Sequence, residues 1–324
     1  MKNIFITGCA GYIAGIITEK LLAENYKISG IDDFRNSYPD NVNKDIKFYL
    51  GNYGNKELLN KIFTENKIDC ICHLAAETTI SHSMSDPYKY FENNLQNGIV
   101  LFEAMRKNKI RNIILSSTAA VYGNPEFTPI NESHKLKPVN AYGESKLMIE
   151  NVLKWYGISY GFKYNIFRYF NASGASNSSG EHRIDESHIL PRIFNAVLNK
   201  TKFKIFGDNY FTKDGTCIRD YVHVEDIADA HIRALKNIEI NDIGIYNLGS
   251  GNGLSVKEIV SLCENELNCF IDIKYEAKRA GDPAELVCTF DKANAELGWK
   301  PLCSTPENII KSGFTWYKKI HGIP

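Results

Sequence analysis

A tyrosine and a lysine four positions apart, Tyr142 and Lys146, have the spacing that most directly suggests chemistry. They lie in residues 141–156, a segment that we predict to be helical, and four-residue spacing places both side chains on one helix face. A phenol with a pKa of about 10 is a poor base at neutral pH. A nearby ammonium group favours the phenolate and lowers that pKa, so the pair could act as a general base and its activating cation. An exposed pair without function has the same spacing, so the surroundings must decide between these interpretations.

The surroundings favour chemistry because hydroxyl groups follow a strongly apolar segment, residues 110–117, that predicts a strand. This segment ends in Ser116 and Ser117, and Thr118 follows directly. If the strand belongs to a parallel sheet, these hydroxyls lie at the carboxyl edge, where ligands bind in such folds.

Two glycines, Gly8 and Gly11, follow the first predicted strand (residues 2–7) and precede a helical pattern. Glycines at such a turn let the backbone approach a pyrophosphate, and the helix N-terminus supplies positive potential. A plain glycine-rich turn is the alternative interpretation. The strand–turn–helix order favours a dinucleotide site.

The second predicted strand ends at Asp32, 24 residues after Gly8, where a ribose-binding acid is expected. Asp33 adds a second carboxylate, and no Arg or Lys directly precedes Asp32, so a 2′-phosphate would be repelled. The pattern favours NAD over NADP, and Arg35 is the one residue that argues against this choice. A solvated acid at a strand end is the alternative for Asp32.

Strands and helices alternate over the first half of the chain, which predicts a parallel sheet covered on both faces. We expect strands at residues 2–7, 27–32, 46–51, 68–76, 110–117 and 164–171, and helices at residues 13–22, 55–65, 88–106 and 141–156. Residues 173–186, rich in Ser, Gly and charge, suit a linker or a substrate loop. Further on, we expect strands at 203–206, 244–248 and 272–275, and helices near 225–235, 256–267 and 305–320. We therefore predict an α/β fold: a Rossmann-type doubly wound domain (residues 1–175) and a smaller mixed α/β substrate domain (residues 176–324), some elements of which can cross back to the first.

The composition narrows the class of protein. Lys plus Arg and Asp plus Glu both number 38 among 324 residues, so a nucleic-acid partner is not expected. No apolar run reaches the roughly 20 residues that span a bilayer. The eight cysteines form no Cys-x-x-Cys pair and no signal peptide is recognisable, which predicts reduced thiols in the cytoplasm. We expect no metal site, and structural roles for His73 and His223.

Several motifs together resemble the extended short-chain dehydrogenase/reductases. The resemblance is carried by Thr7–Ile13, His73–Ala76, Ser116–Thr118, Tyr142 with Lys146, and Arg168–Asn171. Two further segments, Asp214–Val224 and Arg279–Pro283, are similar to the UDP-glucose 4-epimerases (UDP-galactose 4-epimerases) of that family, and the resemblance runs nearly end to end.

The resemblance implies NAD-dependent 4-epimerisation of UDP-glucose and UDP-galactose through a transient 4-keto sugar. It implies that Tyr142 is the base that takes the proton from the sugar 4-hydroxyl while hydride leaves C4 for NAD+. Lys146 is then the partner that lowers the pKa of Tyr142, and Thr118 supplies a hydroxyl that positions the sugar. The implied cofactor contacts are Gly8, Gly11, Tyr12, Ile13, Asp32, Asp33, Asn52, Leu74, Ala75, Ala76, Asn94, Ser116, Tyr142, Lys146 and Tyr169. The implied UDP-sugar contacts are Thr118, Tyr142, Asn171, Ile189, Phe206, Arg219, Tyr221, Arg279, Asp282 and Leu286. A homodimer through the outer faces of the helices at 88–106 and 141–156 is also implied.

Within these contacts, the resemblance assigns Asn171, Arg219 and Arg279 to the diphosphate, Asp282 to the uridine ribose and Phe206 to the uracil. Leu286 falls at the position that gates the sugar 2-substituent, and its size predicts a preference for UDP-glucose and UDP-galactose over their N-acetylated counterparts. Four positions depart from the usual pattern of the family: Ala14 replaces the third glycine, Thr118 a serine, Asn52 an aspartate and Thr78 a lysine. None of these changes removes a catalytic group.

Other functions remain as alternatives. A UDP-pentose or UDP-N-acetylhexosamine 4-epimerase would use the same scaffold. A nucleotide-sugar 4,6-dehydratase needs an Asp-Glu pair after the Ser/Thr strand, whereas this chain has Ala119 and Ala120 there. A dinucleotide-sensing regulator without catalysis would not need Thr118, Tyr142 and Lys146 intact.

Overall fold

The centre of the molecule is a seven-stranded sheet in which every pair of neighbours is parallel. The computed structural model describes residues 2–238 and 243–323. The strands of this sheet, in spatial order, are β10 (Ile243–Leu248), β6 (Lys163–Tyr169), β5 (Asn112–Thr118), β4 (Cys70–His73), β1 (Asn3–Thr7), β2 (Lys27–Asp32) and β3 (Lys47–Leu50). The order of β1 to β6 is that of a Rossmann fold, which confirms the predicted fold class.

The strands form where apolar runs allow burial on both faces of the sheet, as parallel sheets require. Ile4, Phe5 and Ile6 of β1 are fully buried. Thr7, the last residue of β1, pairs with Ile31 of β2 and His73 of β4, and Thr118 at the end of β5 pairs with Tyr169 of β6. The strands therefore end together, and the predicted hydroxyls and acids meet at one edge.

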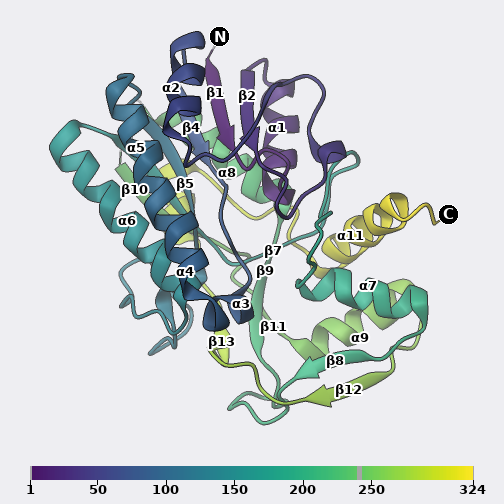
Figure 1. Cartoon of the computed structure of the whole chain (residues 1–324). Coiled ribbons are helices and arrows are strands. Elements are labelled where there is room, and N and C mark those ends of the chain that lie inside the picture. Colours follow the sequence, from purple (N-terminus) through teal and green to yellow (C-terminus); the bar gives the residue numbers. More distant parts are fainter. Residues whose placement is uncertain (1, 239–242, 324) are drawn as a thin grey trace.

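Helices cover both faces of the sheet (Figure 1). One face packs against α1 (Tyr12–Ala23), α8 (Val224–Asn237) and α10 (Asp291–Leu297). The other face packs against α2 (Lys56–Glu65), α5 (Asn97–Lys107) and α6 (Ala141–Tyr160). The α6 helix ends at Gly161, whose φ of 67° is the left-handed conformation that glycine adopts most readily.

The single helix predicted over residues 88–106 is three segments in the structure. These are α4 (Pro87–Tyr90), the π-helix η2 (Phe91–Gln96) and α5. The π-helix buries two polar side chains, Asn93 and Asn94, at a position where the apolar pattern alone gave no sign of a change in helix type.

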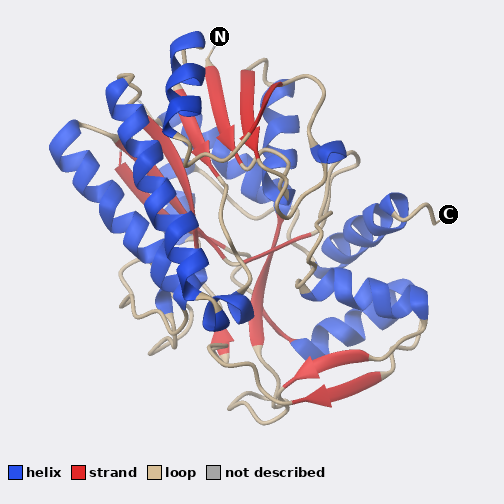
Figure 2. Ribbon diagram, in the orientation of Figure 1, coloured by secondary structure: helices blue, strands red, loops and turns tan. Residues whose placement is uncertain are grey.

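A smaller part of the chain lies beyond the carboxyl edge of the sheet. Figure 2 shows its helices beside short strands. The helices are α7 (Ile189–Asn199), α9 (Val256–Leu267) and α11 (Pro306–Ile320). One small sheet consists of β8 (Phe203–Phe206) and β12 (Ile273–Glu276). In the other, β9 (Ile218–His223) pairs with β7 (Asn171–Ser173), β11 (Gly253–Ser255) and β13 (Glu285–Leu286). The remaining short elements are η1 (Pro39–Asn41), α3 (Ile80–Ser85) and η3 (Ala119–Tyr122).

The chain crosses between the two parts more than once. Both α8 and β10 come after residue 176 in the sequence, yet they pack on and within the seven-stranded sheet. Among the described residues, no helix combines the length and the apolar character needed to cross a membrane.

Candidate active site

A cavity of about 480 Å³ runs along the carboxyl edge of the sheet and continues into the smaller part. It brings together residues from the glycine loop, the ends of β2 and β5, α6, β8 and β9. The predicted site residues that line it are Gly8, Gly11, Tyr12, Ile13, Asp32, Asp33, Asn52, Leu74, Ala75, Ala76, Ser116, Thr118, Tyr142, Lys146, Tyr169, Asn171, Ile189, Phe206, Arg219, Tyr221, Arg279, Asp282 and Leu286.

The glycine loop forms one end of this cavity. Gly8 has a φ of 71°, and a Cβ atom there would lie 2.8 Å from the backbone of Ala75, so only glycine fits. Thr7 accepts hydrogen bonds from the Leu74 and Ala75 N–H groups at 3.2 and 3.3 Å, which holds the end of β4 against the loop. Because Gly11 at the start of α1 has no side chain to cap the helix, the helix N-terminus can face a phosphate. These features fit a dinucleotide.

Asp32 lies at the end of β2 and is held by protein donors. Its carboxylate accepts hydrogen bonds from the Ala10 N–H at 3.0 Å, the Phe34 N–H at 2.9 Å and the Ser37 hydroxyl at 3.0 Å. Burial raises the pKa of Asp32, and these hydrogen bonds oppose the increase. The acid therefore has a fixed orientation at the position expected for a ribose contact.

Tyr142 and Lys146 lie on one face of α6, below the end of β5. Lys146 is buried, and its ammonium group donates to the Ser116 hydroxyl at 3.4 Å. Burial lowers the pKa of Lys146 to about 8, although the charge of Glu150 opposes this. Lys146 is therefore held in a buried position on the same helix face as Tyr142.

The pKa of Tyr142 is set by opposing contributions from burial and from nearby protein groups. Burial raises the pKa of Tyr142, while a hydrogen bond with Thr118 and the charge of Arg183 act in the opposite direction. Burial outweighs the favourable contacts because the phenolate loses more hydration than these protein groups replace.

A buried polar network lies behind this pair and fixes α6 to the sheet. Glu150 of α6 forms an ion pair with Arg168 of β6 at 2.7 Å, and accepts a hydrogen bond from Ser117 at 2.5 Å. Arg168 also donates to the Tyr122 hydroxyl at 3.0 Å, and Tyr122 donates to Asn247 at 2.6 Å. Both ions are almost fully buried, so each requires the other as a partner.

The far end of the cavity is rich in arginine. The Arg279 guanidinium lies 3.9 Å from the centre of the Phe206 ring, and Arg192 lies 5.2 Å from the same ring. Arg219 forms an ion pair with Asp282. Three guanidinium groups against one carboxylate give this end the positive charge and forked donors that suit a diphosphate.

Leu286 belongs to β13, which pairs with β9 at Arg219. It lines the cavity and also packs in a cluster with Val121, Ile130 and Phe170. A change in its size would therefore affect both the cavity and this packing.

Three predicted positions lie away from the cavity wall. Asn94 accepts from the Glu77 N–H at 2.8 Å and donates to the Glu77 carbonyl at 3.0 Å, so it supports the segment after β4. His73 is buried, shares a 2.7 Å hydrogen bond with Thr7, and has its pKa lowered to about 3 by burial and by the charge of Lys146. His223 contacts the Ser312 hydroxyl at 3.0 Å. These contacts fit the structural roles expected for both histidines.

The segment expected to be a linker or a substrate loop lines the cavity, and sequence reasoning missed its charged residues. Arg183 and His188 contact the Glu181 carboxylate at 2.7 and 2.6 Å. The sequence feature that could have indicated these residues is the charged run that begins at Glu181, within a loop rich in Ser and Gly. Glu181, Glu186 and His188 have the spacing of metal ligands, but Arg183 already forms an ion pair with Glu181, so this spacing alone does not define a metal site.

The fold, the glycine loop and the Tyr142–Lys146 pair define a dinucleotide-dependent enzyme class. The chain belongs to the NAD dependent epimerase/dehydratase family, whose family model matches residues 4–249. It is 40% identical to the UDP-glucose 4-epimerase of Lacticaseibacillus casei over 98% of this chain and 97% of that protein.

Solved structures agree with this assignment. A UDP-glucose 4-epimerase from Bifidobacterium longum in complex with NAD+ and UDP matches with a TM-score of 0.94 and 32% identity, over 98% of both chains. A UDP-Glc/GlcNAc 4-epimerase from Campylobacter jejuni matches with a TM-score of 0.84 and 33% identity, over 98% of this chain and 100% of the other.

Proposed function

We propose that this chain is an NAD-dependent 4-epimerase that interconverts UDP-glucose and UDP-galactose. The observation that carries the proposal is the continuous cavity that joins a dinucleotide loop, a tyrosine–lysine pair and an arginine-rich end. A hydride carrier, an acid/base group and a diphosphate site are the three parts that this reaction needs in one place. The nearly full-length similarity to UDP-glucose 4-epimerases supports the same activity.

The residues around the glycine loop would hold the cofactor. Gly8 and Gly11 leave room for the pyrophosphate beside the N-terminus of α1, and Asp32 would accept a ribose hydroxyl. When bound, NAD supplies the acceptor and donor of the hydride at sugar C4.

Tyr142 would take the proton from the sugar 4-hydroxyl and later return it. Lys146, on the same face of α6, would hold the ribose and stabilise the phenolate by its charge. Thr118 would orient the sugar from the end of β5. The 4-keto sugar must then turn within the cavity, so that hydride returns to its opposite face and the configuration at C4 inverts.

Arg219, Arg279 and Asn171 would bind the diphosphate, with the uracil bordered by Phe206 and the uridine ribose by Asp282. Such an anchor on the UDP leaves the sugar as the part that can turn. Because these contacts all lie on the UDP, they support the proposal that the UDP half stays bound throughout the reaction while only the sugar rotates to present its other face.

The proposal is tested by incubating the purified protein with UDP-galactose and following the appearance of UDP-glucose by NMR of the anomeric proton. We expect conversion to an equilibrium mixture from either sugar, without consumption of added NAD. No conversion of either sugar would contradict the proposal, and conversion confined to the N-acetylated pair would favour the UDP-N-acetylhexosamine alternative.

We propose further that the enzyme is a cytoplasmic homodimer of galactose metabolism. Trp155 and Ile158 on α6 are 66% and 75% exposed, and neighbouring apolar side chains of this kind often mark an interface. The eight cysteines are all free thiols, which suits a reducing compartment. Light scattering after gel filtration should give twice the mass of one chain, and Trp155→Glu should give the monomer.

A further inference from the structure

We propose that Asp33 and Glu77 lock Arg35 in an ion-pair network, and that this lock makes the adenosine end of the cavity selective for NAD over NADP. The inference rests on the proposed use of NAD. It concerns the one residue, Arg35, whose charge would otherwise suit a 2′-phosphate.

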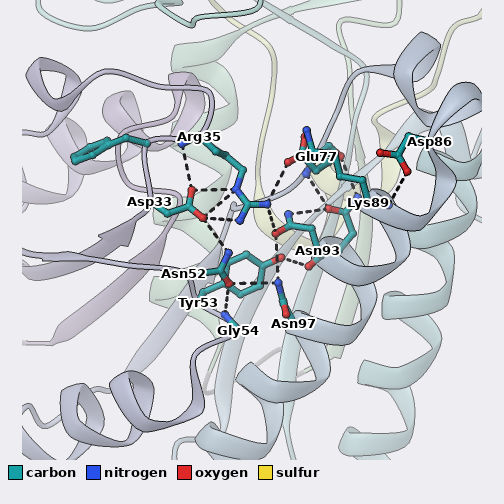
Figure 3. A network of polar contacts seen from close by, with 12 residues as sticks. Asp33, Arg35, Asn52, Tyr53, Gly54, Glu77, Asp86, Lys89, Asn93 and Asn97 are labelled. Carbon is teal, nitrogen blue, oxygen red and sulfur yellow. Dashed lines mark hydrogen bonds and ion pairs between the residues drawn. The ribbon is translucent and has the colours of Figure 1, made fainter.

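The network joins the segments that follow three strands of the sheet (Figure 3). The Arg35 guanidinium donates to both oxygens of Asp33, with Nη2–Oδ2 at 2.6 Å and Nε–Oδ1 at 3.1 Å. Its Nη1 donates to Glu77 at 3.3 Å and to Asn93 at 3.0 Å. Arg35 therefore lies between two carboxylates, one after β2 and one after β4, with its donors directed at protein groups.

Each carboxylate has further partners that keep it in place. Asp33 accepts a hydrogen bond from Asn52 at 2.9 Å, and Glu77 forms an ion pair with Lys89 at 3.1 Å. Burial disfavours the charged form of Asp33, but its contacts with Arg35 and Asn52 outweigh this and keep the pKa of Asp33 below its usual value. Asp33 is thus charged at neutral pH.

The position of the network connects it to the cofactor. Asp33, Arg35 and Asn52 line the same end of the cavity as Asp32, the expected ribose ligand. Two carboxylates, Asp32 and Asp33, line this end with one cation, Arg35, and the Glu77–Lys89 ion pair outside the cavity lining adds no net charge. A 2′-phosphate, which carries a charge of about −1.5 to −2, would enter a region of net negative charge.

Removal of Asp33 changes this balance without removing the cation. Arg35 is 41% exposed, so it can turn toward a ligand once its main partner is gone. Its forked donors match a phosphate. The Asp33→Asn protein should therefore accept NADP through Arg35.

The experiment compares bound nucleotides and not turnover. The unsubstituted protein, Asp33→Asn, Glu77→Gln and the double variant Asp33→Asn/Arg35→Gln are incubated with equal excess NAD+ and NADP+ and then desalted. The nucleotides are released by denaturation and quantified by chromatography. Asp45→Asn, an exposed change of the same charge between β2 and β3, is the matched control.

We expect the bound NADP-to-NAD ratio of Asp33→Asn to rise at least about tenfold, equivalent to about 1.4 kcal/mol, and that of Glu77→Gln to rise less. In the double variant the ratio should return toward that of the unsubstituted protein, and Asp45→Asn should leave it unchanged. A gain that persists without Arg35 would overturn the proposal, because repulsion by Asp33 alone would explain it. No gain in either single variant would also overturn it. Absence of epimerase activity would contradict the proposed function, while this readout would still decide the role of the lock.

Discussion

Replacement of the buried Lys146 by methionine is expected to stabilise the fold while turnover is lost. Burial lowers the pKa of Lys146 from 10.5 to about 8. At about 1.4 kcal/mol for each pKa unit, keeping this lysine charged at neutral pH costs the folded state about 3 kcal/mol. Methionine has a similar length and no charge, and the hydrogen bond that it removes, to Ser116 at 3.4 Å, is a long one.

The effect has a pH dependence that identifies its cause. The folded pKa lies below the unfolded pKa, so between about pH 8 and 10.5 the unfolded chain binds the proton that the folded chain has released. The free energy of unfolding of the unsubstituted protein should rise across this range relative to that of Lys146→Met, which lacks the group. The advantage of the variant, up to about 3 kcal/mol at pH 7, should shrink by pH 10.

Urea unfolding at pH 7 and pH 10 measures this difference, with all proteins at equal NAD content because bound ligand itself stabilises the folded state. Lys61→Met, an exposed change in α2, is the control and should stay within about 0.5 kcal/mol at both pH values. A Lys146→Met protein that is less stable than the unsubstituted protein at pH 7, or whose advantage is the same at pH 10, would refute the reasoning.

Three further predictions concern the same region. Tyr142→Phe should lower kcat at least about 100-fold, because it removes the acid/base group, with circular dichroism and bound NAD unchanged; near-normal turnover would exclude the proposed mechanism. Glu150→Gln leaves the buried Arg168 without its carboxylate and should lower the free energy of unfolding by about 3–5 kcal/mol. The exposed Glu57→Gln is the control and should have little effect. Equal unfolding curves for the two variants would show that the buried pair is not required. Activity on the N-acetylated sugars should be roughly 5–150-fold weaker than on UDP-glucose and UDP-galactose and partly restored by Leu286→Ser; equal kcat/KM on both sugar pairs in the unsubstituted enzyme would show that Leu286 is not the gate.

The sequence predicted the sheet well because its strands are short apolar runs bounded by turns. The first two strands, β1 and β2, end at the predicted residues, Thr7 and Asp32. Thr118, at the end of β5, and the Tyr142–Lys146 face of α6 follow from the same local patterns. Strand ends meet at one edge in any parallel sheet, so these groups could be placed together before any coordinates were known.

The remaining features depend on contacts between distant segments and have weak local signals. β7 and β13 have three and two residues and exist because they pair with β9, which lies at least 45 residues away along the chain from either of them. Arg183 lies in a loop whose composition is typical of a linker, and its place in the cavity wall comes from tertiary packing. The burial of Tyr142, which raises its pKa, is likewise a property of the folded chain and has no local signal.

The late position of β10 in the sequence has a consequence for the synthesis of the chain. β10 is an edge strand whose partner is β6, and about 75 residues separate the end of one from the start of the other. During translation, β6 can pair with β5 long before residues 243–248 leave the ribosome, so its other edge presents unpaired backbone groups beside buried side chains such as Phe167. Exposed strand edges recruit other strands. A nascent or truncated chain that stops near residue 175 should therefore associate with other copies through β6, and the full-length chain covers that edge itself when β10 arrives.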